Sequence, residues 1–543
     1  MKTGFALLIS IALATKASAD CWATRLGFPC CEYSAQVFYT DNDGKWSIEN
    51  GEWCGIIENQ NSNCWSAKLG YPCCKSTTAV EMSDSDGQWG VENGQWCGIQ
   101  KTQNPTTQPA VTQPAITQPA VQPTQVPQRP AQHPKPDIST NVKQIYASNF
   151  NNRRFEGFGT SFCWWANRLG YSDSLAEKAA TLFYDKVNGL GLTVIRYNIG
   201  GGDDPTHHHI TRTDSNMPGY AINPRYDGRS YTWDYNWNSD ANQRNVLLKS
   251  VAKNRDEIIV EAFSNSPPYF MTNSGCSTGN FDANKDNLKS DAYPAFAKYL
   301  ADVAEHFKTS WGVGFQSITP VNEPFTNYWG ANSKKQEGCH FDQGNSESKI
   351  IVELKKAIDQ RGLRDMQISG TDETSIDTQI TSFQKLSNEA KNIITRIDTH
   401  TYGGNSGMIN LNGGYWGVAV ADHDNDKIIL SQKYYGFGQF SRYIRPGYTI
   451  IGCYNNSVAA YDSQGKKLVI VATNPAGTNK IVDFNLSTFT SVGYNVKVIR
   501  TSGSINNGEH WAELPSLVPY GKGFNAELKA NSITTFIVDD VEW

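Results

Sequence analysis

The sequence predicts a multidomain chain in which two small disulfide-rich β modules precede an α/β domain and a β-sandwich. Three observations predict this organisation: a cysteine-rich repeat, apolar runs that alternate with helix-like segments after residue 137, and β-rich runs after about residue 449. Strands that alternate with helices are typical of parallel βαβ units. A length of 543 residues accommodates several such domains.

Residues 1–19 have the features of a secretory signal peptide. Lys2 is followed by the apolar stretch Phe5–Ala14 and by the small residues Ala17-Ser18-Ala19. The apolar stretch is too short to cross a membrane. We therefore expect a secreted, extracellular protein, and the 12 cysteines fit an oxidising compartment. A net charge of −5 gives no support for nucleic acid or an anionic membrane as a partner.

Two modules, residues 20–57 and 63–100, repeat with an offset of 43 residues. Each module is too small to build a stable hydrophobic core unaided, so we expect disulfides to stabilise it. The candidates are Cys21, Cys30, Cys31 and Cys54 in the first module and Cys64, Cys73, Cys74 and Cys97 in the second. Four cysteines allow three pairings, and the sequence does not choose among them. Zinc binding is the alternative, but neither repeat contains a histidine.

A linker, residues 101–136, holds nine of the 23 prolines and should be extended. A globular region follows, with an α/β domain over 137–447 and a β-sandwich over 448–543, to which residues 138–152 contribute a strand. Six short apolar runs predict the parallel strands: Phe158–Trp165, Val194–Gly201, Ile258–Asn265, Ser317–Glu323, Met366–Glu373 and Arg396–Tyr402. Helix-like segments lie between them: Leu175–Val187, Tyr293–Phe307 and Glu347–Gln360.

The tripeptide Asn322-Glu323-Pro324 ends one of these apolar runs. Catalytic groups of a (β/α)8 barrel lie at the carboxyl ends of its strands. A glutamate in that position suits the general acid of a glycosidase, with Asn322 placed to bind a sugar hydroxyl. The alternative is an ordinary polar turn at the end of a strand.

Several motifs occur together in order: Gly157–Trp165, Arg196–Gly201, Ser264–Met271, Thr319–Pro324 and His400–Tyr402. In combination they resemble glycoside hydrolase family 30, in its endo-β-1,6-galactanase-like branch, over about residues 140–540. The resemblance implies a (β/α)8-type barrel with a side β-sandwich, a polysaccharide substrate, no cofactor and no metal. Related branches cut β-1,6-glucan or xylan, so those substrates stay open.

The family hydrolyses glycosides with retention, using an acid/base glutamate after strand four and a nucleophile glutamate after strand seven. The resemblance gives the acid/base role to Glu323. It gives the substrate-binding positions to Asn322, Arg196, Asn265, His400 and Tyr402. For Trp165, stacking on the substrate and packing in the core are equal alternatives.

The nucleophile position is where this chain departs from the family. No glutamate occurs between Glu389 and Glu509, and only 13 residues separate Tyr402 from Trp416. A barrel uses about 30 residues for each βα unit. The sequence therefore predicts a barrel that lacks strands 7 and 8. Either the coding sequence has lost a segment of an active hydrolase, or the chain is an inactive relative that binds glycan.

Some further side chains invite a functional interpretation. Asp422 or Asp424 is a weak alternative nucleophile. His207-His208-His209 suggests a metal site, but a polar loop after a strand, near the substrate cleft, is the favoured interpretation. Cys276 and Cys339 lie in predicted loops and either pair or stay free.

The cysteine modules resemble the dockerin modules of anaerobic-fungal cellulosomes, which are similar to family 10 carbohydrate-binding modules. The resemblance implies docking to a scaffolding protein. The predicted docking surface consists of Trp22, Trp46, Trp53, Trp65, Trp89 and Trp96. Direct cellulose binding by the same aromatic residues is the alternative function, and a disulfide-linked spacer without a binding role is the third.

Overall fold

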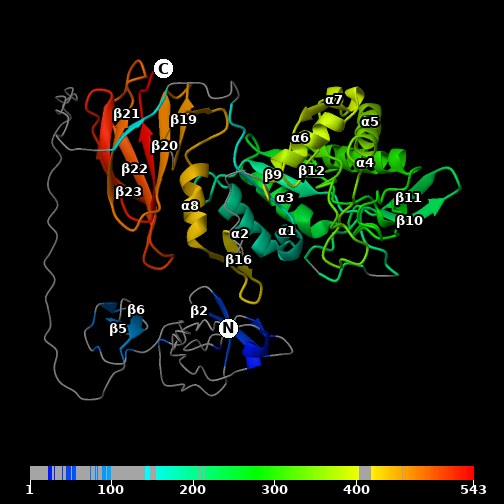
Figure 1. Cartoon of the computed structure of the whole chain (residues 1–543), viewed down its shortest axis with the longest axis horizontal. Coiled ribbons are helices and arrows are strands. Elements are labelled where there is room, and N and C mark those ends of the chain that lie inside the picture. The colour runs from blue at the N-terminus through cyan, green and yellow to red at the C-terminus, as the bar shows by residue number, and fades with distance from the viewer. Residues whose placement is uncertain are drawn as a thin grey trace, which may run out of the picture. The chain divides into compact units, whose positions relative to one another are not determined.

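The computed structural model describes residues 141–146, 154–206, 209–212, 214–402, 417–454 and 456–543, together with short stretches between residues 22 and 99 (Figure 1). The chain divides into two compact units, residues 1–126 and 127–543. The predicted signal peptide and the predicted linker lie outside the described residues. No helix in the described stretches is long and apolar enough to cross a membrane.

Both cysteine modules contain a three-stranded antiparallel sheet with the same register. The strands are β1 (Tyr39–Thr40), β2 (Lys45–Glu49) and β3 (Glu52–Gly55), and then β4 (Met82–Ser83), β5 (Gln88–Glu92) and β6 (Gln95–Gly98). A disulfide joins Cys74 to Cys97, and Cys30 and Cys54 are also disulfide-bonded. The side chains of the six tryptophans predicted to dock lie outside the described residues.

The α/β domain is built on a parallel sheet of six strands. They are β8 (Gly159–Ser161), β9 (Val194–Asn198), β12 (Ile259–Phe263), β13 (Ser317–Thr319), β14 (Gln367–Ser369) and β15 (Ile394–Arg396). Each strand pairs with the next one in chain order, and every pairing is parallel. Five of the six predicted runs contain the matching strand, and the sixth run begins at Arg396, where β15 ends.

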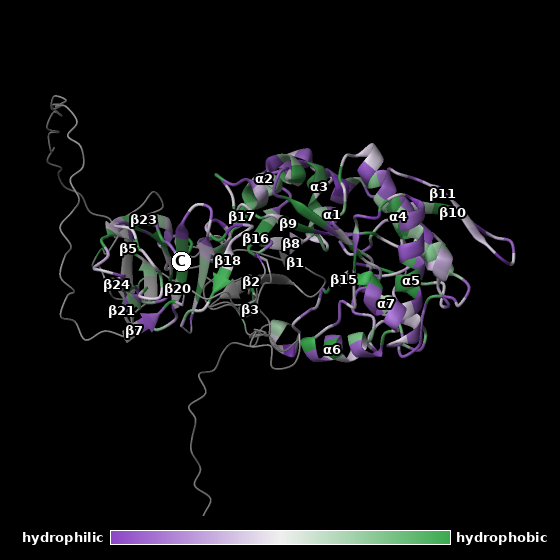
Figure 2. Ribbon diagram, turned by 90° about the horizontal axis from the view of Figure 1, so that it is seen from above, coloured by the Kyte–Doolittle hydropathy of each residue, from purple (hydrophilic) through white to green (hydrophobic). Residues whose placement is uncertain are grey.

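Helices follow the strands and carry one buried face. They are α1 (Trp165–Leu169), α2 (Asp173–Tyr184), α3 (Ala241–Lys253), α4 (Tyr293–Ser310), α5 (Asn345–Gln360), α6 (Ile376–Lys385) and α7 (Asn388–Ile393). Hydrophilic and hydrophobic residues both occur on α4, α5 and α6 (Figure 2). The Ser172 hydroxyl accepts a hydrogen bond from the Leu175 N–H and caps α2. The helix therefore begins at Asp173, two residues before its predicted start at Leu175.

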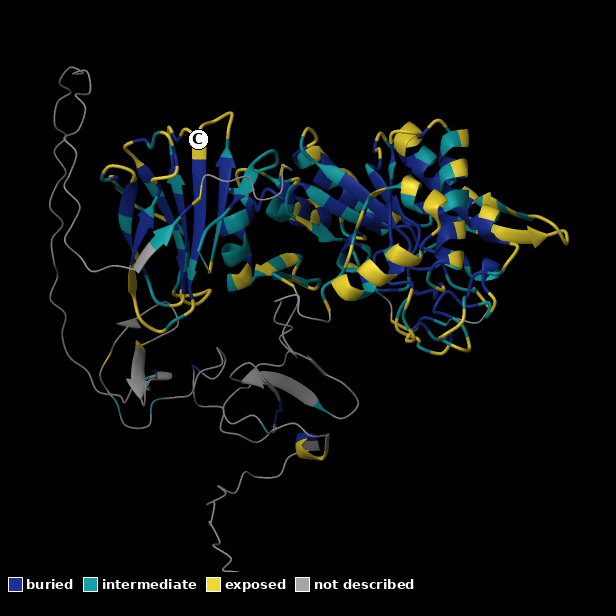
Figure 3. Ribbon diagram, turned by 45° about the horizontal axis from the view of Figure 1, so that its top comes forward, coloured by how far each residue is buried: buried dark blue, intermediate teal, exposed yellow. Residues whose placement is uncertain are grey.

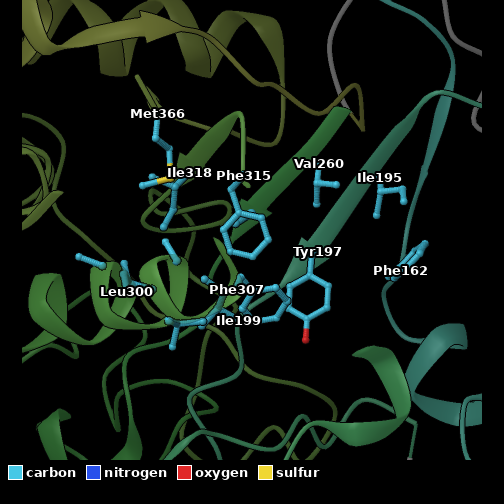
Figure 4. Close-up of a cluster of buried hydrophobic side chains, with 14 of the residues drawn as sticks. Phe162, Ile195, Tyr197, Ile199, Val260, Leu300, Phe307, Phe315, Ile318 and Met366 are labelled. Carbon is cyan, nitrogen blue, oxygen red and sulfur yellow. The ribbon is translucent and has the colours of Figure 1, made fainter. Parts of the chain in front are cut away.

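The core of this domain lies between the sheet and α4 (Figure 4). Tyr197 of β9 packs edge-on against Phe307 of α4, with ring centroids 4.9 Å apart. Phe315 packs against both rings. These fully or largely buried aromatic side chains fix the helix against the strands, so the carboxyl ends of the strands keep a defined geometry.

Arg396 joins the two ends of the described sheet. It lies in β15, and its guanidinium donates at 2.7 Å to Glu156, which precedes β8. The same guanidinium forms an ion pair with Glu261 of β12. Because β8 and β15 are the first and last strands of the sheet order, the contact between Arg396 and Glu156 links the two edges of the described sheet.

A hairpin and α8 follow residue 417. The hairpin consists of β16 (Ala419–Asp422) and β17 (Lys427–Leu430), and α8 spans Gln432–Ser441. Tyr434 of α8 donates to the Leu182 carbonyl of α2 at 2.7 Å, and Gln439 donates to Thr501 of the sandwich at 2.8 Å. This helix therefore connects the α/β domain to the sandwich.

The sandwich contains two sheets. A six-stranded antiparallel sheet is formed by β18 (Thr449–Ile451), β19 (Ser457–Asp462), β20 (Lys467–Asn474), β25 (Ser532–Val538), β22 (Val496–Ser502) and β23 (Glu509–Leu517). The second sheet holds β24 (Gly523–Leu528), β21 (Lys480–Asn485) and β7 (Asn141–Gln144). The strand predicted within 138–152 is thus confirmed. The central strands β20, β22 and β25 of the larger sheet are largely buried, whereas the hairpin of β10 (Ala221–Tyr226) and β11 (Tyr231–Tyr235) is mostly exposed (Figure 3).

Candidate active site

Glu323 lies in the loop after β13, and only 6% of it is exposed. Its φ of +48° is in the left-handed region, which costs a residue other than glycine about 1–2 kcal/mol. Two hydrogen bonds of 2.9 Å hold this backbone, from the Glu323 N–H to the Asp372 carbonyl and from Trp329 Nε1 to the Glu323 carbonyl. The neighbouring loops therefore fix the direction of the Glu323 side chain.

The two carboxylate oxygens of Glu323 have different neighbours. Tyr328 donates its hydroxyl to Oε2. The Nδ1 atom of His400 lies 3.5 Å from Oε1. Burial and the hydrogen bond to Glu323 raise the pKa of Tyr328 well above its usual range, so the phenol keeps its proton and remains a donor.

A network of two buried and two partly buried side chains lies beside Glu323. Arg196 of β9 donates to Asn322 Oδ1 at 2.8 Å and to Asp372 Oδ2 at 2.6 Å. His400 Nε2 lies 3.1 Å from Asn322 Oδ1 and 3.2 Å from Asp372 Oδ1. Both of these partner atoms are acceptors, so His400 carries a proton on Nε2. Burial alone would raise the pKa of Asp372, but Arg196 and His400 hold it below its usual range.

These residues line a cavity of about 1210 Å³ at the carboxyl end of the sheet. Six of the seven residues predicted to form the catalytic and substrate-binding site line it: Glu323, Asn322, Arg196, Asn265, His400 and Tyr402. Tyr402 and Tyr328 are about half exposed at 53% and 48%, so aromatic surface faces solvent at this cavity. Such surface is suited to stacking on a flat apolar ligand face.

Trp165 is the exception among the predicted site residues. Its ring packs edge-on against Phe162 and Phe183, and its Nε1 atom donates to the Ser161 carbonyl at 2.8 Å. The adjacent Trp164 lines the cavity instead. These contacts favour the core-packing alternative for Trp165, and its contact with substrate stays a prediction.

Four carboxylates line the cavity in the described part of the chain: Glu261, Glu323, Asp372 and Asp398. Burial raises the pKa of Glu261 to about 7, Asp398 adds to the rise, and Arg396 and Arg196 oppose it. Asp422 and Asp424 do not line the cavity, and Asp422 instead accepts hydrogen bonds from Asn425 within its own turn. Neither aspartate is placed as a nucleophile for this cavity.

Sequence reasoning missed Asp372, Tyr328 and Glu261. Asp372 had a signal, because it is the penultimate residue of the predicted run Met366–Glu373, but nothing in the sequence pairs it with Arg196. Tyr328 lies five residues beyond Glu323 in a loop whose path has no sequence periodicity. Glu261 lies within an apolar strand, where an isolated acid signals an inward-facing charge.

Other predicted features are placed as follows. His209 lies 3.1 Å from Asp203, while His207 and His208 lie outside the described residues. Cys276 and Cys339 are both buried thiols and are not paired. The segment 403–416, where the sequence predicts the missing strands, also lies outside the described residues.

The fold belongs to a known class of glycoside hydrolases. Over 73% of this chain and all of the compared chain, it superposes with a TM-score of 0.57 and 18% identity on the catalytic domain of a family 30 xylanase C from Talaromyces cellulolyticus. Residues 143–393 match the family model described as O-glycosyl hydrolase family 30.

The sequence comparison identifies the family. The chain is 30% identical over 452 residues to an endo-β-1,6-galactanase of Hypocrea rufa, covering 71% of this chain and 92% of the relative. The chain therefore belongs to glycoside hydrolase family 30, as its motifs predict. Residues 20–56 and 63–99 match a cellulose or protein binding domain. Over 67 residues the chain is 54% identical to feruloyl esterase B of Piromyces equi, which is 11% of this chain and 12% of that protein.

Proposed function

We propose that this chain derives from a secreted hydrolase of β-1,6-linked galactan in which Glu323 is the acid/base residue, and that it lacks one internal segment required for hydrolysis. The observation that carries this proposal is the position of Glu323, buried at the end of β13 in a cavity, with Tyr328 and His400 at its two oxygens. The 30% identity to an endo-β-1,6-galactanase supports the choice of substrate. Xylan and β-1,6-glucan remain the alternative substrates.

The neighbouring network explains how this site binds and acts. Asn322 Oδ1 already accepts from Arg196 and faces His400 Nε2, so its amide NH₂ is left to donate to a sugar hydroxyl. Glu323 donates a proton to the glycosidic oxygen as the bond breaks. Asp372 forms an ion pair with Arg196 and accepts a hydrogen bond from His400, and we give it the role of positioning residue and not of nucleophile.

A retaining reaction requires a second carboxylate about 5 Å from the acid. We infer that this chain lacks the segment that supplies it, between Tyr402 and Trp416. Alignment length supports the inference: it extends over 452 residues, whereas 71% of this 543-residue chain is about 386 residues. The difference, about 66 positions, is close to two βα units of a barrel, at about 30 residues each.

The test is hydrolysis of β-1,6-galactan by the purified 543-residue protein, by Glu323→Gln, and by a chain with about 60 residues of a family relative restored at this junction. We expect reducing sugar only from the restored chain, and a rate about 10²–10⁴ lower when Glu323→Gln is added to it. Activity in the 543-residue protein would contradict the missing segment. Full activity in the restored Glu323→Gln chain would contradict the role of Glu323.

A second candidate function, glycan binding without hydrolysis, is favoured by the absence of any glutamate between Glu389 and Glu509. Affinity electrophoresis in β-1,6-galactan separates it from loss of all function. Retarded migration of the 543-residue protein, abolished in Arg196→Met, would support binding by this cavity.

We also propose that the two N-terminal modules dock the enzyme to a scaffolding protein. Their match to a cellulose or protein binding domain and their similarity to a Piromyces equi enzyme support this. Direct cellulose binding is the alternative. Retention of the full chain on microcrystalline cellulose without any other protein would contradict docking as the main role, whereas capture only by cellulosome scaffold protein would support it.

A further inference from the structure

Outside the cavity, one cluster of side chains combines a buried histidine with two carboxylates. His340, Asp286 and Asp342 each offer one ligand atom, and these atoms all lie within 4.8 Å of one another. His340 is 4% exposed. Asp286 lies between β12 and α4, whereas His340 and Asp342 lie just before α5, so the cluster joins two loops that are separate in sequence.

The two ring nitrogens of His340 both face oxygen acceptors. Nδ1 lies 2.6 Å from the Thr326 carbonyl, so it carries a proton and donates there. Nε2 lies 3.3 Å from Asp342 Oδ1. A neutral imidazole has one N–H, so its Nε2 lone pair would face the carboxylate lone pairs directly. A second proton on the ring, or a cation bound between Nε2 and the carboxylate, resolves this contact.

The arrangement has the form of a metal-ligating histidine. Such a histidine donates its other ring N–H to a carbonyl or carboxylate, which fixes the tautomer and directs the free nitrogen to the metal. Here the Thr326 carbonyl has that role. The Asp286 carboxylate is also held, by the Asp342 N–H at 2.6 Å and by the Ser346 hydroxyl.

The two carboxylates of this cluster also favour a bound cation. The ligand atoms of the Asp286 and Asp342 carboxylates lie within 4.8 Å of each other. Two carboxylates of like charge beside a buried ring are stabilised by a cation between them. Asp342 is 64% exposed on its side chain, so water can reach the cluster and complete a coordination shell.

We propose that Asp286, His340 and Asp342 form a binding site for a divalent transition-metal ion, and that zinc fills it. Imidazole nitrogen with carboxylate oxygens suits zinc, whereas calcium and magnesium take oxygen ligands. The ion is structural: it ties the loop that follows Glu323, through His340 and Thr326, to the loop that holds Asp286. Its binding is independent of hydrolysis.

The test uses the full chain, dialysed against EDTA without reductant and titrated with zinc by calorimetry. Asp342→Asn removes an exposed ligand and should not impair folding, and His340→Gln removes the buried one. Asp365→Asn is the matched control, because Asp365 is exposed and outside the cluster. We expect one zinc lost from both ligand variants, or an affinity at least about tenfold lower, and no change in Asp365→Asn.

Thermal unfolding gives a second readout that needs no activity. Zinc should raise the midpoint of the wild type and of Asp365→Asn but not of Asp342→Asn, because only the folded site binds the ion. Calcium at the same concentration should not reproduce the shift. If wild type binds no zinc, or if Asp342→Asn binds zinc and is stabilised as wild type is, the cluster is not a metal site.

Discussion

At the scale of residues, the site depends on charge partners that the sequence does not pair. The motifs predicted Glu323, Asn322, Arg196 and His400, and all four line one cavity. Asp372 holds Arg196 and His400 in place, yet no spacing rule connects residues that are 176 positions apart. The sequence also left stacking and core packing open for Trp165, and it did not indicate that the neighbouring Trp164 lines the cavity.

Asp372→Asn should destabilise the protein strongly at neutral pH. It leaves the buried Arg196 guanidinium without its carboxylate, and breaking a buried pair in this way costs about 3–5 kcal/mol. The measurement is the denaturant midpoint of the wild type, of Asp372→Asn and of the control Asp365→Asn, which should change the free energy of unfolding by less than about 0.5 kcal/mol.

The same pair has a defined pH dependence. The pKa of Asp372 is lowered in the folded protein, so its stabilisation is present above the unfolded pKa of about 3.9 and is lost as pH falls through the folded pKa. The difference in thermal midpoint between wild type and Asp372→Asn should therefore shrink below about pH 4. A difference that stays constant from pH 7 to pH 3 would contradict this assignment.

Glu373 should show the opposite dependence. Burial raises its pKa to about 7, while the Ser382 hydroxyl and the Phe325 N–H oppose the rise. A raised carboxyl pKa favours folding at low pH, and that contribution is lost as pH rises from the unfolded value of about 4.3 through 7. The thermal midpoint of wild type should fall as the pH rises from 5 to 8. We expect the fall in Glu373→Gln to be at least about 2 °C smaller than in wild type. Parallel pH curves for the two proteins would rule this out.

At the scale of elements, hydrophobic patterning predicted the order and type of the strands. Parallel strands buried on both faces read as continuous apolar runs, which is why five of the six runs contain their strand. Helix ends were less accurate: the helix predicted over Leu175–Val187 is α2, Asp173–Tyr184. Its start is set by the Ser172 cap, which the apolar pattern alone does not locate.

The edges of the parallel sheet give a prediction at this scale. Arg396 of β15 bridges to Glu156 beside β8 and to Glu261. Arg396→Met removes this bridge, so we expect a lower thermal midpoint and more light scattering on heating, because sheet edges without partners associate. Lys427→Met, a change of an exposed strand cation, is the control and should scatter as wild type does. Identical behaviour of the two variants would show that the bridge does not hold the edges.

At the scale of the whole molecule, the order of the modules could be predicted from the sequence, because each part has its own amino-acid composition. Cysteine repeats, a proline-rich stretch and a globular region differ in residue usage, and the two family models match residues 20–56 and 63–99 of the repeats and residues 143–393 of the globular region. The sequence did not predict which strands of the sandwich belong to which sheet. One pairing, between β7 and β21, joins residues more than 300 positions apart.

The central claim is that this chain lacks a segment that carries the second catalytic carboxylate. Sequencing the transcript across the codons for Tyr402 to Trp416 tests it most directly. We predict an insert of about 60 codons, two βα units, containing a strand that ends in glutamate. An uninterrupted junction in every transcript would contradict the claim, and the chain would then be a family member that binds glycan without a retaining nucleophile.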